Sequence, residues 1–297
     1  MRSCGMPRLC LMLALALVAL VATGVEAQSV GDTPWSLVFR IPSPVGDRWL
    51  GAMWASGPND VFAVGRRCIA HFDGRSWSIT PDHSVSAIFD VEGSGPRDVY
   101  AVGSLETIQR WDGTRWTLEH QAAASGLRGG AVGEVLVAAP GEAYALTRDG
   151  ALRRRADGAW EATSEEEVER VRARLAPPEP TATPCRSAAQ ELPSSEAAWV
   201  ARCGGRVWLW TGGAWRDSHL ALVGGRSIDE LLVLDADHDL AVLTNGDVLY
   251  RAGDAWAREL ETRLPGRRGR VSVRTLLRVG DRVYLTADHR IYARTIR

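Results

Sequence analysis

The sequence predicts an all-β fold made of six copies of one four-stranded unit, and three observations lead to this prediction. A Trp that follows a short turn recurs at intervals of 42, 39, 44, 55 and 41 residues. A carboxylate precedes most of these Trp residues by 17 to 19 positions. Each unit also contains short β-branched and aromatic runs separated by Gly, Pro, Asn and Asp. Periods of roughly 40 to 50 residues are typical of propeller blades, so we predict a six-bladed β-propeller.

The recurring Trp opens the fourth strand of each unit. The six copies are Trp35, Trp77, Trp116, Trp160, Trp215 and Trp256. Several follow an Asp-Gly pair, as in "DGRSW" and "DGTRW". Gly adopts a positive φ without steric cost and Asp tolerates it, so this pair predicts a tight hairpin turn. We expect the Trp rings to pack between neighbouring units and to have a structural role.

The repeated carboxylate marks the start of the second strand of each unit. It is found at Asp60, Asp98, Glu142, Glu196, Asp239 and Asp281. In a propeller the second strands begin on the same face as the Asp-Gly turns, so we expect these carboxylates to be structural. The loops of the opposite face differ between copies, and we expect a ligand to bind there.

The two ends of the chain predict how the ring closes. The mature chain begins with an isolated strand, "PWSLVF", and the last unit, "LLRVGDRVYLTADHRIYART", lacks a fourth strand. The N-terminal strand is therefore predicted to complete the last blade, which would pair an exposed sheet edge and tie the termini together. One propeller domain would span residues 28–297.

The first 27 residues have the pattern of a secretory signal peptide. Arg2 and Arg8 precede an apolar run from residue 11 to 21, and "VEA" provides small residues for cleavage after Ala27. The run is too short for a membrane span, which needs ~20 residues. We expect a secreted or periplasmic monomer. A formal net charge of -1 argues against a general nucleic-acid-binding role.

The longest interval contains an insertion at about residues 163–190. Ser164 followed by Glu167 is a capping-box pattern, and Val168, Val171 and Leu175 share one helical face. The predicted short helix is either a lid over the ring or a decoration. Export also bears on the cysteines, because disulfides form in oxidising compartments. Cys185 and Cys203 are predicted to form a disulfide on the loop face, and Cys68 is predicted to be a buried thiol.

Arginines gather on the predicted loop face. The candidate ligand-binding residues are Arg66, Arg67, Arg148, Arg202, Arg267 and Arg268, with Arg263 and Arg270 in the same loop as the last two. Guanidinium groups bind carboxylate, sulfate or phosphate through paired hydrogen bonds, so an anionic ligand such as an acidic glycan is one interpretation. The other is that solvated loops simply collect charge.

The repeats resemble three groups of propellers. "DGRSW" resembles the Asp box of sialidases and related BNR proteins, although that pattern separates its Asp from its Gly. "LAVLTNGDVLYRAGDAW" resembles tectonin-type lectins, and "SGPNDVFAVG" resembles secreted repeat proteins of myxobacteria. These resemblances imply a propeller and disagree about function.

Three functions remain open from the sequence. The first is a non-catalytic binding or scaffold propeller that recognises a glycan or protein. The alternative is an Asp-box-type glycoside hydrolase acting on an anionic glycan, which would need a nucleophile and an acid/base group at the ring centre. The third is a structural subunit of a surface assembly. No catalytic residue, cofactor or metal site is predicted, because the six His residues show no metal-binding spacing.

Overall fold

The structure of the protein is a computed structural model, and only part of the chain is described. The predicted signal peptide lies outside the described residues, as does much of the insertion. The described ranges are 35–42, 49–80, 87–122, 130–147, 150–154, 156–175, 190–191, 199–203, 206–211, 214–221, 228–235, 237–243, 247–258 and 273–296.

The described strands form six four-stranded antiparallel sheets, which we number in chain order. Sheet 1 contains β2 (Leu50–Gly57), β3 (Asp60–Gly65), β4 (Cys68–Phe72) and β5 (Trp77–Thr80). Sheet 2 contains β6 (Ile88–Gly95), β7 (Asp98–Gly103), β8 (Ile108–Trp111) and β9 (Trp116–His120). Sheet 3 contains β10 (Val132–Ala139), β11 (Glu142–Thr147), β12 (Gly150–Arg154) and β13 (Trp160–Thr163).

The remaining three sheets include one that joins both ends of the chain. Sheet 4 contains β14 (Gln190–Glu191), β15 (Trp199–Cys203), β16 (Arg206–Thr211) and β17 (Ala214–Ala221). Sheet 5 contains β18 (Ile228–Val233), β19 (His238–Leu243), β20 (Val248–Ala252) and β21 (Ala255–Arg258). Sheet 6 contains β22 (Val273–Val279), β23 (Arg282–Ala287), β24 (Arg290–Thr295) and the N-terminal strand β1 (Ser36–Arg40).

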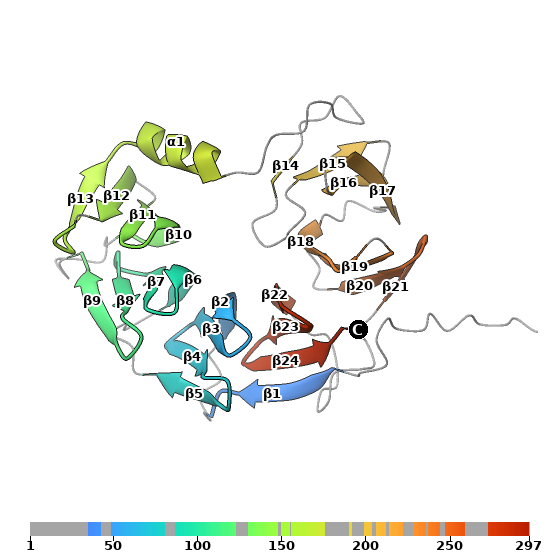
Figure 1. Ribbon diagram of the computed structural model, residues 1–297, viewed down its shortest axis with the longest axis horizontal. Helices are drawn as coiled ribbons and strands as arrows, with labels where there is room; N and C mark the ends of the chain where they lie inside the picture. Colours follow the sequence, from blue (N-terminus) through green and yellow to red (C-terminus); the bar gives the residue numbers. More distant parts are fainter. Residues whose placement is uncertain are drawn as a thin grey trace, which may run out of the picture.

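The sheets stand side by side around a common centre, with their first strands innermost and their fourth strands outermost (Figure 1). Strand β1 pairs antiparallel with β24, from Ser36 opposite Ala293 to Arg40 opposite Arg290. This pairing places the N-terminal strand where the sequence predicts it. Sheets 3 and 4 stand apart in Figure 1, on either side of helix α1 (Glu165–Leu175) and a stretch that is not described.

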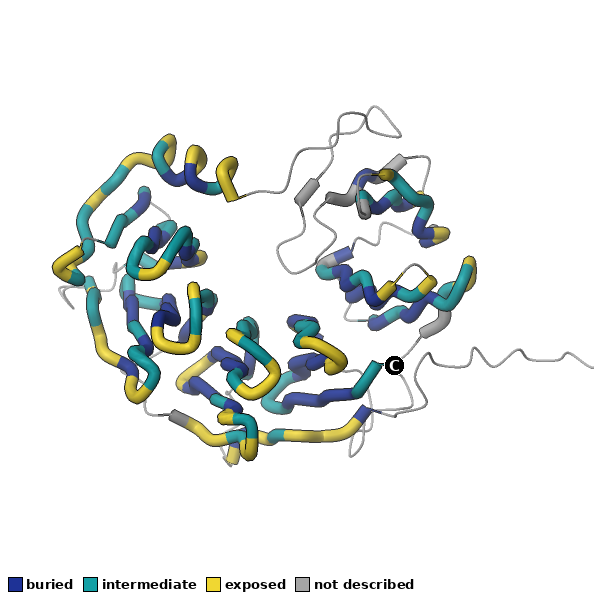
Figure 2. Tube along the Cα trace, viewed as in Figure 1, coloured by how far each residue is buried: buried dark blue, intermediate teal, exposed yellow. Residues whose placement is uncertain are grey.

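Hydrophobic clusters lie between neighbouring sheets, where one sheet packs its face against the next. Figure 2 marks the buried residues of the described strands in dark blue. Between sheets 1 and 2, Phe62 contacts the rings of Trp111 and Trp116, each at 5.6 Å between centroids. The corresponding contact between sheets 2 and 3 joins Tyr100 to Trp160 at 6.0 Å. In sheets 1 and 2 the third residue of the second strand therefore packs against an aromatic ring of the following sheet.

The Asp-Gly turns have the geometry that their sequence predicts. Asp73 accepts hydrogen bonds from the backbone N–H groups of Arg75 (2.9 Å) and Ser76 (2.8 Å), and Gly74 has a φ of 86°. These backbone hydrogen bonds, that from Ser76 first, lower the pKa of the Asp73 carboxyl. The carboxylate therefore holds its own turn, in agreement with a structural role.

Five copies of the repeated carboxylate are described, since Glu196 lies outside the described residues, and three of these five are structurally equivalent. These three are the first residues of β3, β7 and β11, at Asp60, Asp98 and Glu142. In β19 the first residue is His238, and Asp239 is the second. In β23 the first residue is Arg282, and Asp281 precedes the strand. The equivalence expected for the last two copies is wrong, because spacing alone misses one-residue shifts in register.

Helix α1 covers the face of sheet 3 that would otherwise meet a following sheet. It begins after Ser164, whose hydroxyl accepts a hydrogen bond from the Glu167 backbone N–H at 3.1 Å. Val168 and Val171 are buried against sheet 3 in one cluster with Tyr144, the counterpart of Tyr100. In Figure 1 the helix lies at the side of sheet 3 and not over the common centre of the sheets. It therefore packs laterally, where the next sheet would pack at the other junctions.

Candidate functional site

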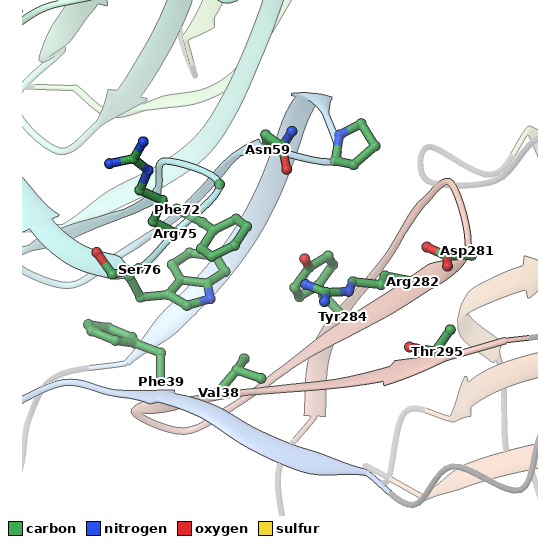
Figure 3. Close-up of a pocket in the computed structure, with 13 residues that line it drawn as sticks. Val38, Phe39, Asn59, Phe72, Arg75, Ser76, Asp281, Arg282, Tyr284 and Thr295 are labelled. Atoms are coloured by element: carbon green, nitrogen blue, oxygen red, sulfur yellow. The ribbon is translucent and has the colours of Figure 1, made fainter.

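A cavity of about 810 Å³ opens between sheets 6 and 1, on the face that carries the Asp-Gly turns. Sheet 1 contributes Asn59, Phe72, Gly74, Arg75 and Ser76. Sheet 6 contributes Arg282 and Tyr284 (Figure 3). The sequence predicts a ligand on the opposite face, whereas this cavity lies on the face of the turns.

Aromatic rings form one wall of the cavity. Trp77 stacks on Phe39 of β1 with ring centroids 5.8 Å apart, and it also contacts Phe72 at 5.6 Å. Tyr284 of β23 meets Trp77 edge-on at 6.1 Å. Val38 of β1 is exposed beside this wall. Aromatic walls of this kind offer a large apolar contact area with little conformational freedom to lose on binding.

The corresponding junction between sheets 2 and 3 is held by a carboxylate. Asp98 Oδ1 accepts hydrogen bonds from the Tyr100 hydroxyl (2.9 Å) and from Arg110 Nε (2.7 Å). Its Oδ2 accepts from the Ser94 hydroxyl and from the Gly141 backbone N–H in sheet 3, both at 2.8 Å. Burial works to raise the pKa of Asp98, but these hydrogen bonds outweigh it and lower the pKa. Asp98 therefore connects the two sheets through a fully ionised group.

At the junction of sheets 6 and 1 this connection is missing, because the first residue of β23 is Arg282 and a guanidinium accepts no hydrogen bond. Tyr284 occupies the position of Tyr100, two residues further along the strand. Tyr284 is 1% exposed, and its hydroxyl has no hydrogen-bond partner in the structure as described. An acceptor that is present at one junction is thus absent at the other.

Two guanidinium groups lie at the cavity, on Arg75 and Arg282. Both residues are exposed, and neither side chain forms a hydrogen bond or ion pair with another described residue. Elsewhere on this face arginines pair within the chain, as Arg154 does with Glu119 at 2.8 Å. The cavity therefore combines an apolar wall, a buried hydroxyl and two cationic groups that are available to a ligand.

A second cavity, of about 860 Å³, lies on the same face at sheet 3. Its charged side chains bind one another: Arg153 bonds Glu161 at 2.6 Å, and hydrogen bonding to Glu161 is the first cause of the raised pKa of Arg153. Tyr144 donates to Glu142 at 3.2 Å. These internal partners leave this cavity with weaker evidence for a ligand than the cavity between sheets 6 and 1.

Two carboxylates on the innermost strand of sheet 2 bind the backbone of sheet 3. Asp90 accepts from the Val135 N–H at 2.9 Å, and Glu92 accepts from the Val137 N–H at 3.2 Å. Burial raises the pKa of Glu92 to about 7, and the negative charges of Asp90 and Glu134 add to this effect. Burial also raises the pKa of Asp90. These groups connect neighbouring sheets, and the described residues contain no cluster of His, Cys, Asp and Glu that could hold a metal.

The arginines predicted to bind a ligand are not brought together by the described part of the structure. Arg66 and Arg67 lie in the turn between β3 and β4, and both are exposed. Arg202 lies in β15, but its side chain is not described. The others, Arg148, Arg263, Arg267, Arg268 and Arg270, lie outside the described residues. An anion site on the loop face stays a prediction.

The predicted disulfide between Cys185 and Cys203 also stays a prediction. Cys185 lies outside the described residues, and the side chain of Cys203 is not described. Cys68 begins β4, is buried as predicted and forms no disulfide. Four tyrosines, Tyr144, Tyr250, Tyr284 and Tyr292, lie within strands. In the part of the chain described, no helix is long and apolar enough to cross a membrane.

The sequence reasoning missed the cavity between sheets 6 and 1. One signal could have found it: "GDRVYLT" has Arg where "PNDVFAV" and "PRDVYAV" have Asp, if the copies are aligned on the aromatic residue of the second strand. The spacing of the carboxylates instead places Asp281 at the position of Asp60 and Asp98, and so does not show that Arg282 occupies it.

No family model matches the chain, and no curated protein matches its sequence. Among solved structures, the chain is similar to YCF48 from Cyanidioschyzon merolae, with a TM-score of 0.53 and 14% identity, over 88% of this chain and 98% of that one. It is also similar to YCF48 bound to D1 peptide, with a TM-score of 0.57 and 14% identity, over 91% and 99%. A chain of the mitotic checkpoint complex gives a TM-score of 0.50 and 14% identity, over 87% and 94%.

At these identities the likeness concerns the fold. YCF48 is a β-propeller protein, and the six antiparallel four-stranded sheets around a common centre agree with that architecture. The protein is therefore an all-β protein of the β-propeller class.

Proposed function

We propose that this chain is an exported, non-catalytic propeller that holds a peptide segment of a partner protein in the cavity between sheets 6 and 1. The observation that carries the proposal is the aromatic wall of Phe39, Phe72 and Trp77 beside two guanidinium groups that have no partner among the described residues. Such a site offers contacts for an apolar side chain and for polar groups at the same time.

Two further arguments favour a peptide. Strands β1 and β5 are the outermost described strands of their sheets, so the outer edge of each presents backbone groups near the cavity that an extended segment could contact. In addition, a structural neighbour, YCF48, is known in a complex with a peptide. A binding or scaffold role agrees with both observations.

A glycoside hydrolase receives less support from this site. Hydrolysis by the usual route requires two carboxyl groups flanking the bond. Of the described residues that line the cavity, Asp281 is the one carboxylate. We therefore propose binding without turnover.

The architecture that we propose has six blades, with β1 completing the last one. Six described sheets and the pairing of β1 with β24 support this arrangement. Export through cleavage after Ala27 is proposed from the sequence pattern, and the N-terminal residue of the mature protein tests it. Gln28 is expected to be that residue.

Selection from a random peptide library on the mature protein tests the function. The selected peptides are expected to bind the wild type, and Phe39→Ala is expected to weaken their binding at least about tenfold, because it removes one ring of the wall. Leu118→Ala is a matched control, because Leu118 is exposed on β9, away from the cavity. If glycans on an array bind and no peptide is selected, the ligand is a carbohydrate and the proposal of a peptide ligand is wrong. Equal effects of the two variants would place the site elsewhere.

A further inference from the structure

The chain builds its own carboxylate-binding site at the junction of sheets 2 and 3. There the carboxylate of Asp98 receives the Tyr100 hydroxyl at 2.9 Å, Arg110 Nε at 2.7 Å and the Gly141 N–H of the next sheet at 2.8 Å. Sheet 3 repeats part of this arrangement, since the Tyr144 hydroxyl donates to Glu142 at 3.2 Å. In both sheets the acceptor is the first residue of the second strand, and the tyrosine lies two positions later on the same strand face.

Sheet 6 keeps the tyrosine of this arrangement and replaces the carboxylate. Tyr284 is 1% exposed, and its hydroxyl has no partner among the described residues. The residue at the position of Asp98 is Arg282, whose guanidinium also has no described partner. Alternate residues of a strand point to one face, so Arg282 and Tyr284 share a face, and both line the 810 Å³ cavity. Figure 3 shows Tyr284 between Phe72 on the sheet 1 side and Asp281 on the other.

A buried hydroxyl without a partner is costly, because it has lost its hydrogen bonds to water. A carboxylate supplied from outside would accept a hydrogen bond from Tyr284 and charge-assisted hydrogen bonds from Arg282, which are stronger than neutral ones. An amide fits this position less well, since its NH₂ group is itself a donor and would face the Tyr284 hydroxyl and the Arg282 guanidinium, which also donate.

We propose that the cavity binds the carboxylate of an acidic side chain, Asp or Glu, of the partner peptide, in the place that Asp98 occupies at the junction of sheets 2 and 3. This inference rests on the proposed peptide-binding function. The neighbouring rings of Trp77 and Phe39 then receive an apolar side chain of the same peptide.

A matched pair of blocked dipeptides tests the carboxylate. The probes are N-acetyl-Phe-Glu-amide and N-acetyl-Phe-Gln-amide, titrated into the full mature protein and followed by NMR at pH 7. The Glu peptide is expected to bind at least about tenfold more tightly. The Arg282→Gln and Tyr284→Phe variants are each expected to reduce this preference, because each removes one donor to the carboxylate.

A second variant tests the same idea from the protein side. Arg282→Asp restores a carboxylate next to the Tyr284 hydroxyl, so the site becomes occupied by the chain itself. We expect the thermal midpoint to rise by about 2–4 °C while binding of the Glu peptide is lost. Arg115→Asp makes the same change of charge on the same face, at a sheet other than those that form the cavity, and is expected to do neither.

The outcomes separate this inference from the function on which it rests. Equal affinity for the two dipeptides, with binding reduced by Phe39→Ala, would overturn the carboxylate and leave peptide binding intact. Failure of both dipeptides to bind would also overturn the carboxylate, and the library selection would then decide the function independently. Retention of the preference for Glu in Arg282→Gln would overturn the inference, even if Arg282→Asp failed to fold.

Discussion

Replacement of Asp98 by Asn is expected to destabilise the protein strongly, although it changes only one oxygen to an NH₂ group. The Asp98 side chain is 10% exposed and accepts hydrogen bonds from four groups, including Arg110 Nε at 2.7 Å and the Gly141 N–H of the next sheet. Asn offers one acceptor oxygen, and its NH₂ group must face donors such as Tyr100 or Arg110. The substitution therefore leaves two donors of sheet 2 without their acceptor.

The magnitude follows from the hydrogen bonds that are lost. A hydrogen bond to a charged group contributes about 1.5–3 kcal/mol, and both Arg110 and Tyr100 donate to the ionised Asp98 carboxylate. Loss of these two bonds, each taken at the low end of that range, gives about 3 kcal/mol of unfolding free energy. The pKa of Asp98 is lowered in the folded protein, so this stability is present above its ordinary pKa of 3.8 and is lost as the pH falls through the lower folded value.

Urea unfolding at pH 7 and at several acidic pH values measures both effects. Asp112→Asn is the control, since Asp112 holds its own exposed turn through the Thr114 and Arg115 N–H groups. The control is expected to lose clearly less stability at pH 7. A loss of under about 1 kcal/mol in Asp98→Asn, or equal losses in the two variants, would refute the view that this carboxylate connects the sheets.

Three further predictions concern other buried groups. The pKa of Glu92 is raised to about 7, so the folded state binds more protons than the unfolded state between about pH 4.5 and 7, and stability falls as the pH rises through this range. Glu92→Gln is expected to reduce this fall in urea unfolding, with the remainder due to the raised pKa of Asp90, and an unchanged pH profile would contradict the assignment. Tyr284→Phe is expected to leave the free energy of unfolding unchanged or higher, because the Tyr284 hydroxyl has no described partner. Tyr100→Phe should cost about 1 kcal/mol in the same assay, because the Tyr100 hydroxyl donates to Asp98. Equal costs for the two variants would contradict the view that Tyr284 lacks an acceptor. Val168→Ala removes two buried methyl groups between α1 and sheet 3 and is expected to cost about 1–3 kcal/mol, whereas a cost near zero would mean that the helix is not packed there.

The regular part of the fold could be predicted because its determinants are local. The Asp73 turn is built by hydrogen bonds within four residues, and the start of α1 is built by Ser164 and Glu167. The short apolar runs of β-branched and aromatic residues in "DVFAVG" and "DVYAVG" similarly identify strands without reference to the rest of the chain. Local interactions of this kind leave a clear trace in the order of the residues.

The position of α1 could not be predicted from its own amphipathic pattern. Val168 and Val171 show that one face is buried but do not show what buries it. The structure places them against Tyr144, at a junction where the other sheets receive a neighbouring sheet. Only the three-dimensional packing decides between a lid and a lateral contact.

The sequence by itself determined the strands, the turns, the helix cap and the repeat that organises them, because each depends on residues within a few positions of one another. Only the tertiary structure decided where a ligand could bind. The cavity joins Phe39 of the first strand, Trp77 of sheet 1 and Tyr284 of sheet 6, which meet because β1 pairs with β24. A one-residue shift of register decides that Arg282, and not Asp281, stands at the position of Asp98. That shift changes the charge of the site, and the pairing of the strands fixes it.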